Sequence, residues 1–199
     1  SMHRQVLLLA AAQALFQTAS VLVMTVGGLA GGQVAPEARF ATAPIAAMFL
    51  GTALSTFPAA MWMARAGRRS GFVVGAVLGT AGGLVAAFGL LSGSLLVLCI
   101  GTLLVGAYQG FAQFYRFAAS EVSDERFRPR AISFVLAGGI VAALLGPALG
   151  HLGGPLLSQA YAGSFVLLAA VSLLAAGLLL GLRMPQPRSV DGESEGRPW

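Results

Sequence analysis

Six long apolar runs divide this chain, and each is long enough to cross a lipid bilayer as a helix. A bilayer core of about 30 Å takes roughly 20 apolar helical residues. Inside lipid, backbone groups must bond within their own segment, so such runs form helices and not open strands. None of the runs alternates in polarity as a membrane β-barrel strand does. The predicted spans are residues 6–30, 41–63, 72–91, 95–120, 131–149 and 156–182.

The composition agrees with a lipid environment and excludes a water-soluble domain. The 199 residues are 57% hydrophobic and only 10% charged, whereas soluble domains carry about a quarter charged residues. The net charge is +5, and every basic residue is an arginine. These arginines stand in short runs between apolar segments, so they indicate contacts with lipid headgroups and not a nucleic-acid-binding face. The sequence therefore predicts an all-α membrane protein with six transmembrane helices.

Arginines fringe only alternate junctions between the predicted spans. The other three junctions hold Arg39 alone. Because basic residues concentrate in cytoplasmic loops, we expect a multi-pass protein of the cytoplasmic (inner) membrane with both termini in the cytoplasm. Eleven of the twelve basic residues fall on that side: Arg4, Arg65, Arg68, Arg69, Arg116, Arg126, Arg128, Arg130, Arg183, Arg188 and Arg197.

The spans leave only short polar ends. Residues 1–4 form a brief cytoplasmic N-terminus in which Ser1 resembles a cloning remnant, and residues 5–183 form the six-helix domain. A signal peptide is the alternative for the N-terminus, but the apolar run continues to Gly32 and is long enough to span. Residues 184–199 are rich in proline and acidic residues, which predicts a disordered cytoplasmic tail or interdomain linker.

The sequence offers no catalytic, metal or cofactor site. Cys99 is the single cysteine, and His3 and His151 are isolated, so neither a disulfide nor a metal site is expected. An intramembrane serine protease would need a Gly-x-Ser-Gly setting and a membrane histidine. The nearest string, ending in Ser92, has the wrong spacing and lies beside a loop. We therefore expect a protein that is not an enzyme.

The junction between the second and third spans has a recognisable pattern. Residues 63–69 read Met-Ala-Arg-Ala-Gly-Arg-Arg, in which a glycine permits a tight turn and arginines can pair with carboxylates or helix C-termini. The string resembles the cytoplasmic signature Gly-x-Leu-Ala-Asp-Arg-x-Gly-Arg-Arg of the major facilitator superfamily, whose loop latches one state of the transport cycle. A plain basic loop is the alternative. The matching positions are Arg65, Gly67, Arg68 and Arg69.

The fifth span carries a second pattern that resembles this family. Small residues recur every fourth position and a proline follows one glycine, which makes a smooth stripe for close helix packing and a point where the helix can bend. The pattern is similar to the family's exporter and antiporter motif Gly-x-x-x-Gly-Pro-x-x-Gly. Generic membrane packing is the alternative. The residues are Gly138, Ala142, Gly146, Pro147 and Gly150.

The resemblance covers residues 5–183 and implies the N-terminal half of a transporter, built from two three-helix repeats. Family members have twelve helices, so a second six-helix half is the implied partner, either a C-terminal half or another copy. The implied function is alternating-access transport of a small molecule, with secondary active efflux as its direction. A non-transporting scaffold or accessory subunit is the alternative.

Polar side chains within the first and fourth spans are the candidates for a substrate cavity. Polar groups in membrane helices usually face the bundle interior, and in the resembled fold these two helices line the cavity. Glutamines suit a neutral polar substrate, although hydrogen bonds between helices are the alternative role. The arginine of the set can instead extend to the headgroups. The candidates are Gln13, Gln17, Tyr108, Gln109, Gln113 and Arg116.

Two departures from the family pattern concern charge. The signature aspartate falls at Ala64, and the arginine of an exporter motif in the fourth span falls at Gly106. Glu121, at the inner end of the fourth span, is therefore the carboxylate expected to pair with the loop arginines or to couple protons. A coupling acid in the second half is the alternative, because no Asp or Glu lies within the middle of a predicted span.

Overall fold

The computed structural model describes residues 2–153, 155–157 and 160–184, and in this part the chain forms helices and no strand. Within the described residues, six helical spans are long and apolar enough to cross a membrane. The predicted fold class is confirmed. The elements are α1 (Met2–Val34), η1 (Ala38–Phe40), α2 (Ala43–Ala66), α3 (Arg68–Ser92), α4 (Leu95–Ala112), α5 (Tyr115–Val122), α6 (Arg128–Gly153) and α7 (Ala162–Leu180).

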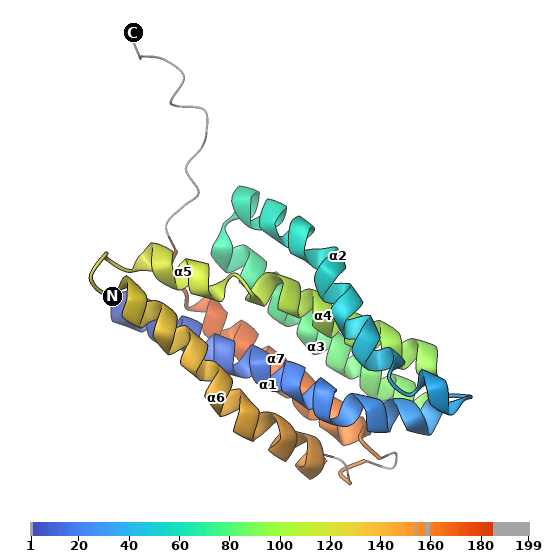
Figure 1. The fold of residues 1–199 in the computed structure, drawn as a ribbon. Coiled ribbons are helices and arrows are strands. Elements are labelled where there is room, and N and C mark those ends of the chain that lie inside the picture. The colour runs from blue at the N-terminus through green and yellow to red at the C-terminus, as the bar shows by residue number, and fades with distance from the viewer. Residues whose placement is uncertain (1, 154, 158–159, 185–199) are drawn as a thin grey trace.

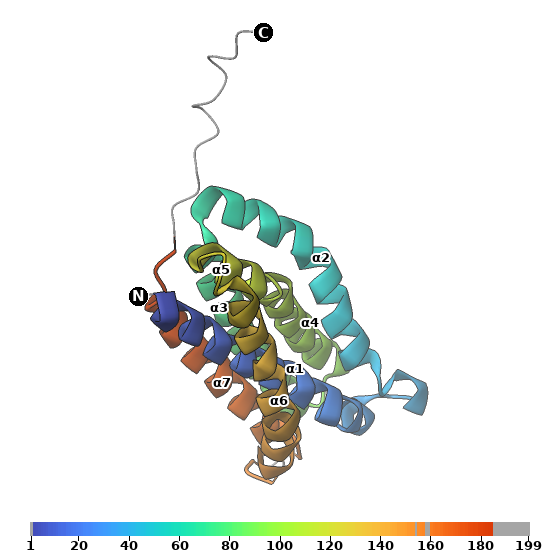
Figure 2. The ribbon, with the colours of Figure 1, turned by 60° about the vertical axis from the view of Figure 1, so that its left-hand side comes forward.

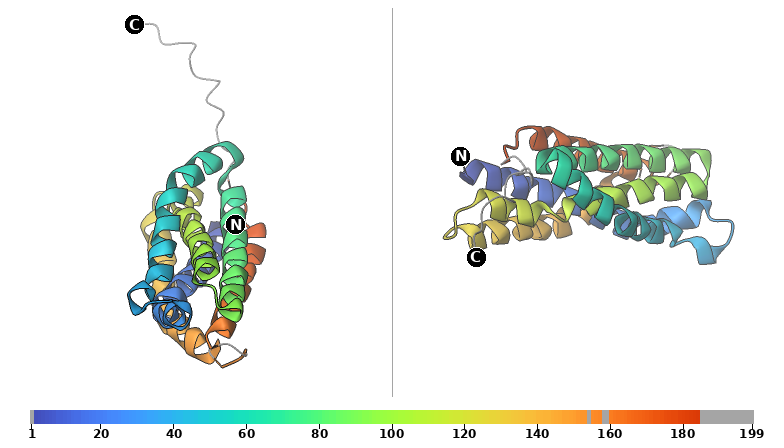
Figure 3. Two further views of the ribbon diagram at one scale, coloured as in Figure 1. Left: turned by 90° about the vertical axis from the view of Figure 1, so that its right-hand side faces the viewer. Right: turned by 90° about the horizontal axis from the view of Figure 1, so that it is seen from above.

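The helices run side by side in one elongated bundle (Figures 1 and 3). About half of α1, α3, α4 and α7 is buried, whereas α2 and α6 are mostly exposed. The exposed side chains of these two helices are largely apolar, as Phe57 and Leu144 illustrate. The predicted tail, apart from Met184, lies outside the described residues.

The helix contacts repeat between the first three spans and the last three. α1 packs along α6 and α4 packs along α2, so the first helix of each unit lies against the second helix of the other. α3 packs against α4, and α7 against α1, in the same exchanged manner. Exchanging the two units leaves this pattern of contacts unchanged, which is the arrangement that two three-helix repeats produce.

Glycines allow the central helices to approach until their backbones touch. A Cβ atom on Gly106 of α4 would overlap the carbonyl oxygen of Met48 in α2, and one on Gly51 would overlap that of Leu103. In lipid, such close packing supplies much of the attraction between helices. It also explains the departure at Gly106, because no arginine side chain could occupy that position.

The predicted fourth span is not one continuous helix, which corrects the expectation for residues 95–120. α4 ends at Ala112 and α5 begins at Tyr115, with a turn at Gln113 and Phe114. The Gly110 carbonyl, which Phe114 N–H would bond in a continuous helix, accepts instead from the Gln113 side chain at 3.3 Å. Phe114 N–H donates to the Phe111 carbonyl at 3.3 Å. A side chain competing for a backbone acceptor thus interrupts the helix.

The sixth span begins later than predicted. The expectation started it at residue 156, but α7 begins at Ala162. Tyr161, just before it, has a left-handed backbone with φ 70°, a conformation that cannot continue a right-handed helix. Residues 155–157 form turns and bends.

α2 curves at its end near α3 (Figure 2). Pro58 lies inside this helix. A proline has no N–H to donate to the carbonyl four residues earlier, so the helix loses one hydrogen bond and can bend there. α2 then meets α3 through a single residue, Gly67, whose φ of 92° only glycine adopts readily. The tight turn predicted at this position is confirmed.

Contacts between distant segments gather most arginines at one end of the bundle. Arg68 contacts Glu121, and Arg69 contacts Leu180. The Arg183 amide donates to the Gln5 side chain at 2.6 Å. The N-terminus, the α2–α3 junction, α5 and the end of α7 therefore share this arginine-rich end, whereas Arg39 lies in η1 between α1 and α2.

Candidate functional site

A hydrogen-bonded group of polar side chains joins α1, α2 and α4 in the middle of the bundle. The Gln109 amide of α4 donates to the Ser20 hydroxyl of α1 at 2.7 Å. The Thr52 hydroxyl of α2 donates to the Gln109 carbonyl oxygen, also at 2.7 Å. One glutamine thus uses a donor and an acceptor to connect two other helices.

A second pair lies about one helical turn away toward the arginine-rich end. The Gln113 amide donates to the Thr56 hydroxyl at 2.8 Å, and the Thr56 hydroxyl donates to the Thr52 carbonyl at 2.7 Å. The side-chain carbonyl oxygen of Gln113 accepts no hydrogen bond within the described part of the chain and is not buried. Together, Ser20, Thr52, Thr56, Gln109 and Gln113 form what we term the polar cluster.

The polar cluster offers neutral donors and acceptors and no charge. Gln109 and Gln113 are half-buried, as are Thr52 and Thr56. A ligand in contact with them would meet amide and hydroxyl groups that are already held in place by neighbouring helices. Such groups suit a neutral molecule with several hydrogen-bonding atoms, and substrate binding by the glutamines stays a prediction.

Two of the glutamines of α1, the candidates Gln13 and Gln17, precede Ser20 by one to two turns but do not join the polar cluster. Gln17 packs against Gly139 of α6, where an added Cβ would lie 2.6 Å from the glutamine Oε1. That oxygen is buried and has no hydrogen-bond partner among the described residues. Gln13, one turn earlier, is 7% exposed. Both face crowded surroundings in the half-molecule, so their role in binding stays a prediction.

Tyr108 lies apart from two other candidates of the fourth span, Gln109 and Gln113. Its side chain is fully buried and stands edge-on to Phe16 with ring centroids 5.9 Å apart. A Cβ on Gly79 of α3 would overlap the Tyr108 ring. Tyr115 is buried beside it against Phe72. The structure therefore places Tyr108 in an aromatic core between α1, α3 and α4 and not on the polar cluster.

Arg116 follows the break between α4 and α5 and is exposed. Its guanidinium carbon lies 5.4 Å from the centre of the Phe117 ring, a distance at which a cation and an aromatic face attract each other. No carboxylate among the described residues lies within ion-pair distance of it. This placement leaves both predicted roles open to experiment, a cavity cation or an arginine reaching the headgroups.

One loop arginine, Arg68, pairs with Glu121, although the aspartate of the family signature is absent from this chain. Arg68 makes two contacts with Glu121, at 2.8 Å and 3.3 Å, the fork-to-fork geometry that favours arginine–carboxylate pairs. Its guanidinium also lies 5.6 Å from the Phe114 ring centre. The pair ties the start of α3 to α5, directly beyond the break in the fourth span. Arg65 is exposed in the last turn of α2.

The small-residue stripe of α6 packs against α1. Gly138, Ala142, Gly146 and Gly150 are all buried. A Cβ on Gly146 would lie 2.6 Å from the Val21 side chain. Pro147 lies inside α6, which continues to Gly153. The close packing predicted for this stripe is confirmed, whereas its link to antiport is not addressed by packing.

Sequence reasoning missed the hydroxyl partners of the polar cluster. The sequence does not single out Ser20, Thr52 and Thr56 as site residues, because a hydroxyl in a membrane helix can bond the carbonyl four residues earlier and so needs no partner from another helix. Ser20 does contact the Phe16 carbonyl, at 3.2 Å. The available signal was the spacing of Thr52 and Thr56, which puts two hydroxyls on one face of an otherwise apolar helix.

Sequence comparisons match the whole membrane domain. The family model of the Major Facilitator Superfamily matches residues 6–199. The chain is 40% identical over 199 residues to the riboflavin transporter RfnT of Brucella anthropi, covering 98% of this chain and 50% of that protein. It is 26% identical to the MFS-type transporter YdeG of Bacillus subtilis, covering 98% of this chain and 47% of that protein. The chain thus spans about half the length of the curated relatives it matches.

Solved structures share the fold at low sequence identity. A partially occluded, inward-open structure of the xylose transporter XylE from E. coli superposes with a TM-score of 0.78 at 19% identity, covering 92% of this chain and 50% of that one. The fucose:proton symporter FucP of E. coli gives a TM-score of 0.65 at 20% identity, covering 91% and 49%. At these identities the likeness shows the fold alone.

Proposed function

The chain belongs to the major facilitator superfamily, and from this membership we propose that it forms the N-terminal half of a secondary transporter that moves a small neutral molecule by alternating access. The observation that carries the proposal is the polar cluster. Its side chains join α1, α2 and α4 inside apolar spans, where polar groups are expensive and mark substrate pathways.

We propose riboflavin as the first substrate to test. The relative with 40% identity is a riboflavin transporter, and a flavin ring carries several neutral hydrogen-bond donors and acceptors. Gln109 and Gln113 present amides that can bond such an edge. The sugar transporters among the solved structures support the fold only and do not bear on the substrate.

The second half of the transporter is the proposed partner. Residues of the polar cluster belong to helices that remain partly exposed in this half, so a facing half would complete the walls around a substrate. A C-terminal half encoded downstream or a second copy of this chain would meet this need. The arginine-rich end is proposed to face the cytoplasm of the inner membrane, because basic residues concentrate on that side.

The direction of transport is proposed from the sequence pattern of α6. The Gly-Pro motif that includes Gly146 and Pro147 favours efflux with an antiported ion, whereas the relative's name states transport without a direction. Proteoliposomes holding the whole transporter, loaded with riboflavin or bathed in it, separate the two directions. A riboflavin gradient that dissipates equally in empty and protein-containing vesicles would contradict the transport proposal and favour the scaffold alternative.

The Arg68–Glu121 pair is proposed as a latch at the arginine-rich end. The pair is partly exposed, with side-chain exposures of 24% and 45%, so its loss should change stability by less than about 1 kcal/mol. We expect Glu121→Gln to change the transport rate severalfold while the protein stays folded, and Arg68→Glu with Glu121→Arg to restore part of it. Retention of the full rate and pH dependence in Glu121→Gln would exclude both the latch and a proton-coupling role.

A further inference from the structure

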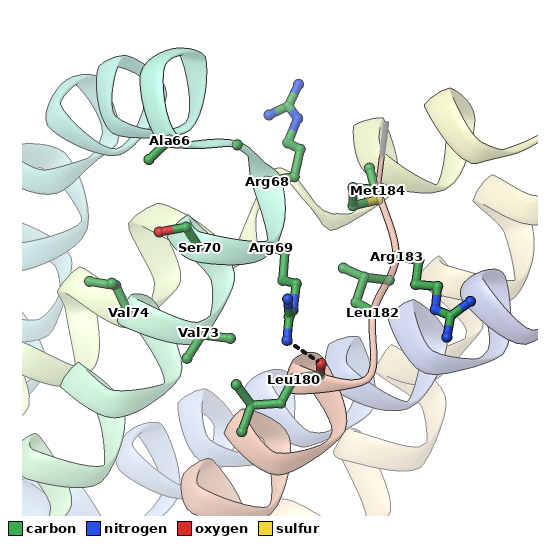
Figure 4. Close-up of a pocket in the computed structure, with 11 residues that line it drawn as sticks. Ala66, Arg68, Arg69, Ser70, Val73, Val74, Leu180, Leu182, Arg183 and Met184 are labelled. Carbon is green, nitrogen blue, oxygen red and sulfur yellow. Dashed lines mark hydrogen bonds between the residues drawn. The ribbon is translucent and has the colours of Figure 1, made fainter. Parts of the chain in front are cut away.

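A pocket at the arginine-rich end, separate from the polar cluster, lies between α3 and α7. It has a volume of about 640 Å³ and lies between the start of α3 and the end of α7. Figure 4 shows the α3 residues on one wall and the segment that follows α7 on the other. Three arginines and no acidic residue line it: Arg68, Arg69 and Arg183.

Arg69 is the arginine that reaches across the pocket. One of its N–H groups donates to the Leu180 carbonyl at 2.7 Å (Figure 4). A guanidinium has five N–H groups, and the remaining four have no acceptor within the described part of the chain. Arg69 is therefore held in position by the end of α7 while most of its donors stay available to an anion.

The side chains of the other two arginines point away from Arg69, Arg68 from the start of α3 and Arg183 from the segment that follows α7 (Figure 4). Arg68 is held by Glu121, so its charge is largely compensated. Arg183 is exposed, and its side chain makes no hydrogen bond or ion pair with the described residues. An anion in the pocket would thus meet one fixed guanidinium and one that is free to approach.

The backbone at the start of α3 adds to this positive field. Gly67 is the N-cap and has no side chain to accept from the first-turn N–H groups. Unbonded N–H groups and the helix dipole favour an anion near a helix N-terminus. This contribution reinforces the arginines that define the pocket.

The surface that continues from the pocket toward the bilayer is apolar. Val73, Val74 and Leu180 form part of the pocket lining. Along α3, Val77 follows Val73 by one turn and is 52% exposed, and along α7, Leu173 precedes Leu180 by two turns and is 60% exposed. A ligand with a phosphate at the pocket and hydrocarbon chains over these residues would match both surfaces.

We propose that this pocket binds the phosphate group of an anionic phospholipid, with Arg69 and Arg183 as its ligands. The pocket lies at the ends of two spanning helices, which is the depth of lipid headgroups. Basic pockets between membrane helices suit such headgroups. The site links α3 and α7, the helices that contact each other across the two repeats, and is independent of the transported substrate.

The test uses the whole transporter in micelles of neutral detergent, titrated with phosphatidylglycerol or with phosphatidylcholine, while native mass spectrometry counts the bound lipids. We expect phosphatidylglycerol to bind more tightly. Each arginine near a phosphate contributes about fivefold in affinity, equivalent to about 1 kcal/mol. Arg183→Gln should thus weaken binding about fivefold, and Arg69→Gln with Arg183→Gln about 25-fold. Arg183→Gln is the cleaner single variant, because Arg69 also caps α7.

The matched control is Arg126→Gln with Arg130→Gln, which removes the same charge from the same end without touching the pocket. Equal weakening in both double variants would overturn the site and indicate diffuse attraction. Inorganic phosphate that competes with phosphatidylglycerol at equal concentration would overturn the lipid assignment in favour of a free anion. A large gain in lipid affinity after neutralising Asp191, Glu193 and Glu195 would mean that the chain's own acidic segment is the occupant. The measurement reads lipid binding, so its failure would leave the transport proposal unaffected.

Discussion

The contact between α2 and α4 and the contact between α1 and α6 are equivalent in the exchanged arrangement of the two units, yet they are built differently. Both contain glycines at which a Cβ would collide with the facing helix, Gly106 in one and Gly146 in the other. In the described part of the chain, the α2–α4 contact carries hydrogen bonds between side chains and the α1–α6 contact does not; they run from Thr52 to Gln109 and from Gln113 to Thr56. In the α1–α6 contact the buried Gln17 oxygen has no partner among the described residues.

This difference indicates that the hydrogen bonds are not needed to hold the helices together. The α1–α6 pair also packs closely along glycines of α6 without such hydrogen bonds among the described residues. Polar groups between membrane helices add only about 0.6 kcal/mol each on average. The following variants test whether the polar cluster serves substrate binding, as proposed above, or the stability of the helix contact.

The largest expected effect comes from filling the glycine contacts. Gly106→Ala places a methyl group against the Met48 backbone and should destabilise by about 3 kcal/mol, at the upper end for overpacking, whereas Gly146→Ala meets the Val21 side chain and should lose about 1–2 kcal/mol. Gly177→Ala is the control, because nothing lies within 4 Å of its added Cβ. Unfolding in denaturing detergent measures all three. Equal stability of Gly106→Ala and Gly177→Ala would contradict the close packing.

The next effect separates binding from packing. Gln109→Leu removes both hydrogen bonds of that side chain, but Ser20 and Thr52 can fall back on carbonyls of their own helices, so stability should fall by only about 1 kcal/mol. Riboflavin transport should fall about tenfold or more, as expected when a ligand loses about 1.4 kcal/mol of interaction. Thr80→Val, which affects a hydroxyl bonded within α3, is the control and should transport normally. Unchanged transport in Gln109→Leu would remove the polar cluster from the site.

A smaller effect of opposite sign is expected in the α1–α6 contact. Gln17→Met replaces a buried oxygen that has no partner among the residues that the structure describes, and relieving an unpaired buried polar group is worth about 1 kcal/mol. The variant should therefore resist thermal unfolding better than the original protein. A lower unfolding temperature would show that Gln17 has a partner, such as water or the second half, and the contrast between the two contacts would weaken.

The smallest effect is expected at the edge of the polar cluster. Thr56→Val keeps the side-chain shape but removes the acceptor of the Gln113 amide, which should lower stability by about 0.6 kcal/mol or less. The apparent affinity for riboflavin should shift about twofold, given that Gln113 also has the Gly110 carbonyl as a partner. Destabilisation greater than that of Gln109→Leu would mean that hydrogen bonds hold α2 to α4 after all.

The sequence predicted the architecture well and the candidate site only in part. Hydrophobic length fixed six spans, and the arginine pattern anticipated which junctions share one end. Gln109 and Gln113 of the fourth span lie in the polar cluster, whereas Tyr108 does not, because a helix turns by 100° per residue and carries Tyr108 into the aromatic core; substrate binding by these residues stays a prediction. The hydroxyls of Ser20 and Thr52 are partners of Gln109 because the fold brings α1 and α2 beside α4.

By itself the sequence determined that this protein lies in a membrane and how many spans it has, because apolar length and charge act locally along the chain. The family resemblance came from its loop and helix motifs. Only the tertiary structure decided which polar groups meet, that Arg68 is the loop arginine that pairs with Glu121, and that the fourth span breaks at Gln113. Those outcomes depend on contacts between residues far apart in the chain, and a one-dimensional pattern does not fix the rotation of one helix against another.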